Sequence, residues 1–353
     1  MSSVVLRTDA SPEIGIGHLA RCLALGEALL ECGARSILAT RTRSPALLAR
    51  ALGVLERVER VPDSAEADAD ETIRIARACR AAWIVLDGYH FDAAYRERLQ
   101  AGGVPVLCVD DAGVERYTCE VVVNGNLYGE DLRYSPSERT RILAGPDYAL
   151  LRREFRAPGP PRTPDTSGPR ILVTLGGSDP GDHVATLLEA LSGVLRGGEA
   201  VRVIVGPAAD PDIARRAIAA LPARAAVVHA AEQMAPHMRW ADRCITAAGS
   251  ICLEYARMGV PMAAGIVADN QVPVARSVET HGLGIDLGWL ARAPRHASNA
   301  PASAGLTDKL AAWFADQAGR RRQARAGPAL VDGAGALRIA THMLESLGRA
   351  AHA

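Results

Sequence analysis

The stretch RTDASPEIGIGHLARCLALGEALLECG, residues 7–33, joins an apolar run to a helical pattern through two glycines. Residues 4–6 just before it are apolar enough for a buried strand, and from residue 18 to 32 leucine, alanine and cysteine recur at helical spacing. Glycine before a helix lets the backbone approach a ligand closely, and the free N–H groups of a helix start attract anions. Strand, glycine turn and helix in this order are typical of a parallel α/β domain.

The same alternation continues through the rest of the chain. Further apolar runs of strand length cover residues 36–39, 83–86, 104–109, 120–123, 171–175, 201–205, 226–229, 244–247 and 262–266. Helical patterns separate many of these runs, and residues 306–347 are rich in alanine, leucine and arginine. The chain is therefore predicted to be of the α/β class, with mostly parallel sheets covered on both faces by helices.

A proline-rich stretch divides this pattern in two. Residues 156–170 contain five prolines, which excludes a continuous helix or a central strand. We predict an N-terminal Rossmann-like domain over residues 1–156, a linker over 157–169, and a C-terminal Rossmann-like domain with terminal helices over 170–353. Ligands of open α/β sheets bind beyond the carboxyl ends of the strands, so we expect the ligand in a cleft between the two domains.

Composition excludes several function classes. The 353 residues include 40 basic and 40 acidic side chains, and this balance gives no general attraction to nucleic acid or to an anionic membrane. No apolar run reaches the ~18 residues of a membrane span, and no secretory leader is recognisable. The seven cysteines have no metal-binding or disulfide spacing. We expect a cytoplasmic enzyme with reduced thiols, without a metal, a membrane span or a nucleic-acid partner.

His18 is the candidate catalytic residue. It follows Gly15 and Gly17 at the expected helix start, but the third glycine of the dinucleotide fingerprint is missing, so hydride transfer is not indicated. The helix dipole disfavours the imidazolium at this position and keeps the ring able to accept a proton. The alternative is a polar helix-start residue without a chemical role.

Two loops in the second half are candidate anion sites. Gly177 and Ser178 follow one apolar run, and Gly249 and Ser250 follow another, each before a helical pattern. Consecutive backbone N–H groups in such loops can bind a diphosphate. Glu254 lies one turn into the second helix, where it would accept hydrogen bonds from ribose hydroxyls, unless it is a surface or capping residue. Glycine is also common in ordinary β–α turns.

Polar side chains at two further strand ends suit a sugar. Asp87 and Tyr89 follow the run over 83–86, and Asn270 and Gln271 follow the run over 262–266. Hydroxyl and amide groups of a sugar would find hydrogen-bond partners there, although aspartate and asparagine also stabilise turns. The remaining histidines have no metal-ligand spacing.

Residues 229–261, HAAEQMAPHMRWADRCITAAGSICLEYARMGVP, resemble the nucleotide-binding half of GT-B glycosyltransferases that use UDP-N-acetylglucosamine. A narrower resemblance covers the chain to about residue 288. Its motifs are Arg7-x-Asp9, Gly15-x-Gly17-His18 with Arg21, Asp87-x-Tyr89, GPDYALLRREF at 145–155, VTLGGSDP at 173–180 and Asp269-Asn270-Gln271. Together they resemble the UDP-2,4-diacetamido-2,4,6-trideoxy-β-L-altropyranose hydrolase family of the pseudaminic acid pathway.

This resemblance implies a GT-B fold and the release of UDP and free sugar by water attack at the anomeric carbon, with inversion and without a cofactor. It makes His18 the base and places Tyr89 and Asn270 at the sugar. It implies that Gly249, Ser250 and Glu254 bind UDP. The family has a small hydroxyl residue after its glycine–serine pair, and this chain has isoleucine and cysteine there.

The leaving group decides how much catalytic machinery is needed. Ordinary glycosidases use two carboxyl groups because a departing alkoxide must be protonated, whereas a nucleoside diphosphate leaves as a stable anion. A base, a water molecule and donors toward the diphosphate are then sufficient. The alternatives are a GT-B glycosyltransferase with a UDP-N-acetylhexosamine donor, a hydrolysing UDP-sugar 2-epimerase and a non-catalytic nucleotide-sugar binder. A binder needs no base, so His18 weighs against it.

Overall fold

The structure, a computed structural model, describes residues 2–11, 14–113, 116–157, 168–177, 179, 181–290 and 305–350. Its contacts divide the chain into two compact units. Unit 1 contains the described residues up to Arg156 together with those from Gly333 onward, and unit 2 contains those between. Most of the predicted linker, residues 158–167, lies outside the described residues.

Unit 1 is built on a seven-stranded parallel sheet in the order β3-β2-β1-β4-β5-β7-β9. Its strands are β1 (Ser3–Thr8), β2 (Arg35–Thr40), β3 (Arg57–Arg60), β4 (Ala81–Asp87), β5 (Val106–Val109), β7 (Val121–Asn124) and β9 (Arg141–Ala144). A small separate sheet pairs β6 (Arg116–Tyr117) with β8 (Ser135–Pro136). The chain winds outward from β1 in one direction and from β4 in the other, so the sheet reverses between these two central strands.

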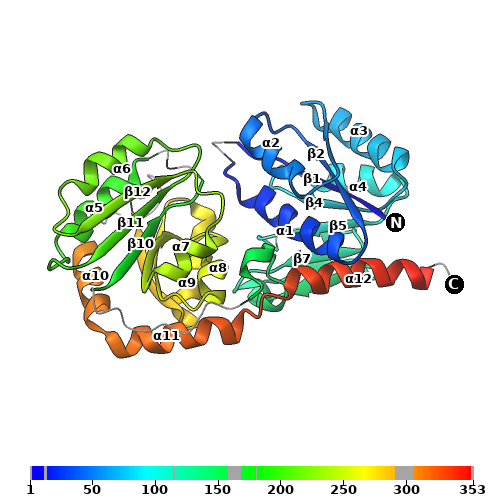
Figure 1. Ribbon diagram of the computed structural model, residues 1–353. Helices are drawn as coiled ribbons and strands as arrows, with labels where there is room; N and C mark the ends of the chain where they lie inside the picture. Colours follow the sequence, from blue (N-terminus) through cyan, green and yellow to red (C-terminus); the bar gives the residue numbers. More distant parts are fainter. Residues whose placement is uncertain are drawn as a thin grey trace. The chain divides into compact units, whose positions relative to one another are not determined.

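Helices cover both faces of this sheet (Figure 1). They are α1 (Gly17–Glu31), α2 (Pro45–Leu52), α3 (Ala65–Ala78), α4 (Ala93–Ala101) and α12 (Gly335–Ala350), with single 3₁₀ turns at Gly129–Asp131, Pro146–Tyr148 and Arg153–Phe155. Side chains alternate along β1: Val4 and Leu6 belong to the core under α1 and α12, and Val5 belongs to the core under α3 and α4. This period of two divides the apolar residues between two cores.

The C-terminal helix corrects the predicted domain boundary, which assigned all of residues 170–353 to the second domain. α12 packs against α1 in unit 1, beside the blue helix in Figure 1. Ile339 and Met343 are fully buried in the same core as Leu25, and Trp83 Nε1 donates a hydrogen bond to the Met343 carbonyl at 2.9 Å. Burial of this apolar helix face decides its place, because position along the chain does not constrain where a terminal helix docks.

Unit 2 holds a six-stranded parallel sheet in the order β12-β11-β10-β13-β14-β15. Its strands are β10 (Arg170–Thr174), β11 (Ala200–Val205), β12 (Arg224–His229), β13 (Arg243–Ala247), β14 (Met262–Ile266) and β15 (Gly284–Trp289). Its helices are α5 (His183–Ser192), α6 (Pro211–Ile218), α7 (Ala235–Trp240), α8 (Ile251–Arg257), α9 (Val272–Thr280), α10 (Leu306–Ala315) and α11 (Gln317–Leu330). None of the helices in the described ranges is long and apolar enough to cross a membrane.

Both sheets therefore have the doubly wound topology expected from the sequence. The reversal lies between β1 and β4 in unit 1 and between β10 and β13 in unit 2. Adjacent loops diverge to opposite faces at such a point, which leaves room for a ligand at the carboxyl ends of the strands. The candidate site residues that the structure describes lie at these strand ends, in the loops that follow them or in the first turns of the next helices.

Candidate functional site

His18 lies in the first turn of α1, beyond the carboxyl end of β1. Gly15 has a φ of +80°, a left-handed conformation that favours glycine, and its N–H donates to the Ser11 carbonyl at 2.8 Å. The reversal turns the chain into the helix, which begins at Gly17. His18 is only 6% exposed, so its imidazole sits in a largely desolvated position.

Asp87, the last residue of β4, holds the imidazole. Its Oδ1 atom lies 2.6 Å from His18 Nδ1, and its side chain is fully buried. A carboxylate oxygen only accepts, so we assign the ring proton to Nδ1, which donates in this hydrogen bond. The other ring nitrogen, Nε2, then has a free lone pair and is the atom able to take a proton from a ligand or water. Asp87, predicted as a substrate contact, forms a hydrogen bond with this histidine.

Arg21, one turn further along α1, joins Asp87 to a second carboxylate. Its Nε donates to Asp87 Oδ2 at 2.9 Å and its Nη2 to Asp87 Oδ1 at 2.6 Å. Its Nη1 donates to both oxygens of Asp111, at 2.7 and 2.8 Å. Nη2 also lies 2.8 Å from His18 Nδ1, so the guanidinium is close to the imidazole itself.

Asp111, which follows β5, binds two further side chains beside this arginine. Burial opposes ionisation of Asp111, but the adjacent Arg21 guanidinium outweighs it and holds the pKa of the carboxyl below its usual range. Asn126 Nδ2 donates to its Oδ1 at 2.7 Å, and the Tyr89 hydroxyl donates to its Oδ2 at 3.0 Å. The Tyr89 ring is 60% exposed and meets the His18 ring edge-on, with centroids 4.7 Å apart. Tyr89 is therefore a fixed and accessible neighbour of His18.

The sheet order explains why these residues meet. β1, β4, β5 and β7 are consecutive in the sheet, and their carboxyl ends lead to His18, Asp87, Asp111 and Asn126, respectively. Sequence reasoning missed Asp111 and Asn126, because acids at a strand end often cap the next helix and an Asn-Gly-Asn sequence is typical of a turn. The turn role belongs to their neighbour Asp110, which accepts hydrogen bonds from the N–H groups of the two residues after Asp111. The signal available was the pair of acids directly after an apolar strand.

A second buried network fixes the backbone at the start of the His18 loop. Arg7 is completely buried and pairs with Asp9 at 2.7 Å and Asp68 at 2.5 Å. Asp9 also accepts from the Arg41 backbone N–H at 2.6 Å and lies 3.2 Å from His90 Nε2. Burial opposes ionisation of Asp9, but the hydrogen bonds from His90 and Arg7 hold the pKa of its carboxyl well below the usual range. This network ties the loop to β1, β2 and α3.

In unit 2, the loop after β10 is less open to an anion than its glycines suggested. Asp179 accepts the backbone N–H groups of His183 and Val184, at 3.0 and 2.9 Å. The first N–H groups of α5 thus already bind a carboxylate of the same chain, which would repel a phosphate. Gly177 lies in this loop, and Ser178 lies outside the described residues.

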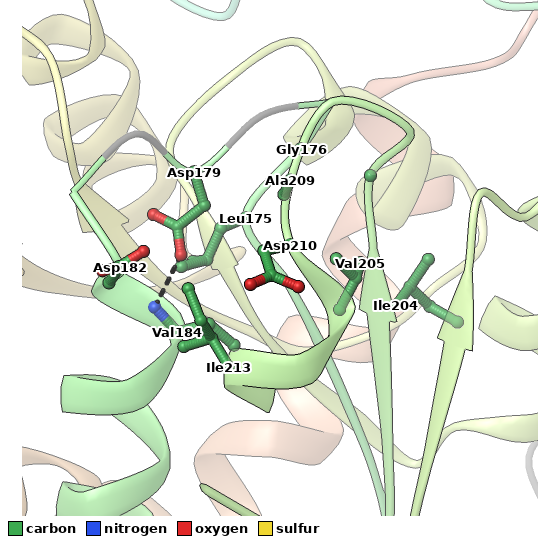
Figure 2. A pocket seen from close by; sticks show the side chains of 11 residues that line it. Leu175, Gly176, Asp179, Asp182, Val184, Ile204, Val205, Ala209, Asp210 and Ile213 are labelled. Carbon is green, nitrogen blue, oxygen red and sulfur yellow. Dashed lines mark hydrogen bonds between the residues drawn. The ribbon is translucent and has the colours of Figure 1, made fainter. Parts of the chain in front are cut away.

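The pocket beside this loop confirms that restriction. Figure 2 shows Asp179, Asp182 and Asp210 around it, with the apolar Ile213 and Val184 at its floor. Its volume is about 20 Å³, which is enough for a water molecule and too small for a diphosphate. The predicted anion site at Gly177 is therefore not formed by this pocket.

The loop after β13 is more accessible to a ligand than the loop after β10. The Ala248 N–H donates to the Gly265 carbonyl and the Gly249 N–H to the Ala247 carbonyl, so these two donors are engaged within the fold. The Ser250 N–H, by contrast, has no hydrogen-bond partner among the described residues, and Ser250 is exposed at the start of α8. A Cβ atom at Gly249 would meet nothing within 4 Å, so the backbone there is accessible.

Ile251 and Cys252 follow the glycine–serine pair, where the family has a hydroxyl, and the second of them belongs to the core. Cys252 is fully buried, and burial raises the pKa of its thiol to about 12. Its Sγ lies 3.7 Å from the Ala247 carbonyl, to which it can donate. Cys252 is therefore a neutral packing residue. Glu254, two positions on, is partly exposed on α8.

The third loop of unit 2 carries Asn270 and Gln271 in a short 3₁₀ turn after β14. Gln271 Oε1 accepts the Val267 N–H at 3.0 Å and so braces the loop, while Asn270 is exposed. Because β10, β13 and β14 are neighbours, the loops with Gly177, Gly249 and Asn270 follow adjacent strand ends. Among the residues that the structure describes, no three His, Cys, Asp or Glu side chains are grouped as a metal site.

Comparisons with known proteins agree with this architecture. The chain is 29% identical over 245 residues, 69% of each protein, to the spore coat polysaccharide biosynthesis protein SpsG of Bacillus subtilis (strain 168). The calicheamicin glycosyltransferase CalG4 superposes with a TM-score of 0.65 at 16% identity, covering 99% of both chains. A putative UDP-N-acetylglucosamine 2-epimerase from Listeria monocytogenes gives a TM-score of 0.65 at 13% identity, covering 98% of this chain and 97% of that one. No protein-family model matches the chain.

At these identities, the structural neighbours establish the fold and nothing finer. Two doubly wound parallel sheets in series, matched over nearly the whole length by a glycosyltransferase and an epimerase, confirm the predicted α/β class. The chain has the GT-B fold.

Proposed function

We propose that this protein hydrolyses a UDP-linked amino or deoxy sugar to UDP and the free sugar, with His18 as the base that activates water. The observation that carries the proposal is the His18–Asp87 pair. The buried carboxylate fixes the ring proton on Nδ1 and leaves Nε2 free, at the carboxyl edge of an α/β sheet where ligands bind. The SpsG relative, named for polysaccharide biosynthesis, and neighbours that act on sugars support a nucleotide-sugar substrate.

The arrangement suits water attack at the anomeric carbon. Nε2 takes a proton from water as the C–O bond to the diphosphate breaks, and UDP departs without a general acid because it is already a stable anion. Attack from the face opposite the leaving group inverts the anomeric carbon. A positioned base of this kind contributes about 10² to 10⁴-fold in rate.

The remaining residues have proposed binding roles. Tyr89 contacts the sugar, since it is exposed and fixed beside His18. In unit 2 the exposed Ser250 binds the diphosphate of UDP, with Gly249 allowing close approach, and Glu254 accepts the ribose hydroxyls. Asn270 and Gln271 at the next strand end contribute polar groups to the sugar. The substrate proposed from the sequence motifs is UDP-2,4-diacetamido-2,4,6-trideoxy-β-L-altropyranose, for pseudaminic acid-type nonulosonate biosynthesis.

Incubation with UDP-sugars in ¹⁸O-enriched water, without any acceptor, tests the reaction. Hydrolysis at carbon puts the label into the free sugar and leaves UDP unlabelled, and NMR of the fresh product gives the anomer. UDP release that requires an added sugar acceptor would instead identify a glycosyltransferase. A labelled sugar with altered configuration at C2 would identify a hydrolysing 2-epimerase.

Substitution of the base separates catalysis from binding. His18→Ala should lower turnover at least about 100-fold, while UDP affinity measured by calorimetry stays unchanged. His281→Ala, which removes an imidazole from the C-terminal end of α9, ahead of β15, is the matched control and should leave turnover unchanged. Near-normal turnover in His18→Ala would show that His18 is not the base.

A further inference from the structure

We propose that Arg21 is a positioning residue that keeps His18 in its proton-accepting form, by neutralising the carboxylate that orients the ring. The inference deepens the proposed function, because it concerns the same base. It rests on the geometry of four side chains: His18 and Arg21 on α1, Asp87 at the end of β4, and Asp111 after β5.

Arg21 is fully engaged inside the protein and has no edge to offer a ligand. Its Nε and Nη2 bind the two oxygens of Asp87, and its Nη1 binds both oxygens of Asp111, all at 2.6 to 2.9 Å. The side chain is 13% exposed. A phosphate-binding arginine would turn this bidentate fork toward the substrate, so the bonds observed here favour a role exerted through Asp87.

That role follows from charge. A carboxylate in contact with a histidine stabilises the imidazolium, which is the form that cannot act as a base. The Arg21 guanidinium shares the charge of Asp87 through two hydrogen bonds and places its own positive charge 2.8 Å from Nδ1. Asp87 can thus fix the ring orientation while Arg21 opposes protonation. A unit charge within ~4–6 Å shifts a titration by about one to three pH units.

The other ionisable groups that the structure describes around the ring do not contribute a charge next to it, so the protonation of His18 depends on Asp87, Arg21 and Asp111. Burial raises the pKa values of Cys22, in the next turn of α1, and of Tyr128, whose hydroxyl donates to the Asp111 carbonyl; both stay neutral in the working range. Tyr89 presents its ring edge to His18 and its hydroxyl to Asp111. His90, in the loop after β4, pairs with Asp9 in the neighbouring network.

The test measures the titration of the His18 ring directly, so that it does not depend on turnover. Long-range ¹⁵N–¹H spectra of the full chain report the tautomer and the titration midpoint of each imidazole, and the His18 signals are those missing from His18→Ala. Arg21→Gln keeps hydrogen-bond donors and removes the charge, and its midpoint should rise by about one pH unit or more. Arg21→Lys keeps the charge, so its midpoint should stay near that of the wild type.

The pH dependence of hydrolysis should distinguish Arg21→Gln from Arg21→Lys in the same way as the titration midpoints do. In Arg21→Gln the acid limb of kcat/KM moves to higher pH by the same amount, whereas in Arg21→Lys turnover falls at all pH values through lost positioning alone. Arg74→Gln is the control, since it removes an exposed arginine that pairs with Glu71 on α3 and should move neither measurement.

The possible outcomes are distinct. An Arg21→Gln protein that folds and titrates like the wild type overturns the inference, even if its turnover is lower. If Arg21→Gln does not fold, Asp111→Asn replaces it; this change frees the guanidinium charge of Arg21 and should lower the midpoint, and an unchanged or raised midpoint overturns the inference. If no UDP-sugar is hydrolysed, the proposed function fails, while the NMR midpoints still decide the role of Arg21.

Discussion

Replacement of Asp87 by asparagine is a stringent test of the His18 site, because it alters hydrogen bonding with little change in shape. Asp87 Oδ1 accepts from His18 Nδ1 and from Arg21 Nη2, both at 2.6 Å, and Oδ2 accepts from Arg21 Nε at 2.9 Å. Asparagine has a single acceptor oxygen. Its NH₂ group must therefore face a donor of Arg21 in either orientation.

The two orientations differ in what they do to the base. With the amide oxygen toward His18, the ring keeps its proton on Nδ1, but one charge-assisted bond to Arg21 is lost. With the NH₂ group toward His18, Nδ1 becomes the acceptor and the proton moves to Nε2, which removes the base. Each orientation loses one hydrogen bond to Arg21, so the two should have similar energies and a large fraction of the molecules should hold the inactive tautomer. The molecules with the active tautomer lack the negative charge that stabilises the imidazolium formed during the reaction.

The expected size follows from these losses. Turnover should fall by about 10² to 10³-fold, within the range for a positioned base. One lost charge-assisted hydrogen bond at a buried site costs about 1.5–3 kcal/mol of unfolding free energy. For a unit of this size that lowers the melting temperature by about 3–12 °C. UDP affinity should not change, because Asp87 is assigned no contact with the nucleotide.

The assay compares kcat/KM for UDP release, the melting temperature and the ring tautomer seen by NMR. Asp92→Asn is the matched control: Asp92 caps α4 by accepting the Tyr95 N–H at 2.8 Å, and asparagine caps helices equally well. It should alter none of these three quantities. An Asp87→Asn protein that melts earlier yet turns over at the wild-type rate would refute the orienting role of Asp87.

Four other predictions concern the rest of the molecule. Gly249→Ala should leave the melting temperature unchanged, since its methyl group meets nothing within 4 Å, but should weaken UDP binding measured by calorimetry. Gly206→Ala should instead destabilise unit 2, because its Cβ would lie 2.3 Å from the Gly176 carbonyl oxygen, a change visible in thermal unfolding. Asp9 has a lowered pKa in the folded state, so its contribution to stability is present above the unfolded value of about 3.9 and is lost as pH falls below it. Urea unfolding from about pH 5 to about pH 3 should therefore show a smaller loss of stability in Asp9→Asn than in the wild type. Met343→Ala should destabilise unit 1 by about 2–5 kcal/mol, measured by urea unfolding, because a fully buried side chain is truncated.

The pattern of missed strands shows what local sequence can predict. The expected runs over 36–39, 83–86 and 171–175 all lie in strands with neighbours on both sides. The three strands of the large sheets that the sequence analysis missed, β3, β9 and β15, all lie at sheet edges. An edge strand has one strand neighbour and tolerates charges, as in the RVER sequence of β3, so its apolar signal is weak.

Candidate site residues divide in a similar way. His18 could be selected from sequence because the glycines before it mark a strand-to-helix turn, and Asp87 because it ends an apolar run. The hydrogen bond between them could not be predicted, since they are 69 residues apart and meet only because β1 and β4 are adjacent. Asp111 could equally have capped a helix and Asn126 could have belonged to a plain turn; the sheet order brings Asp111 to Arg21 and Asn126 to Asp111.

The sequence by itself determined that the chain folds as two doubly wound α/β units, because the period of its apolar residues follows from backbone geometry at each position. It also determined which residue types stand at the strand ends. Only the tertiary structure decided which of these side chains touch, that Asp179 occupies the start of α5, and that α12 completes the core of unit 1. These features depend on burial and on contacts between segments that are distant in the sequence, so they cannot be predicted from a local sequence pattern.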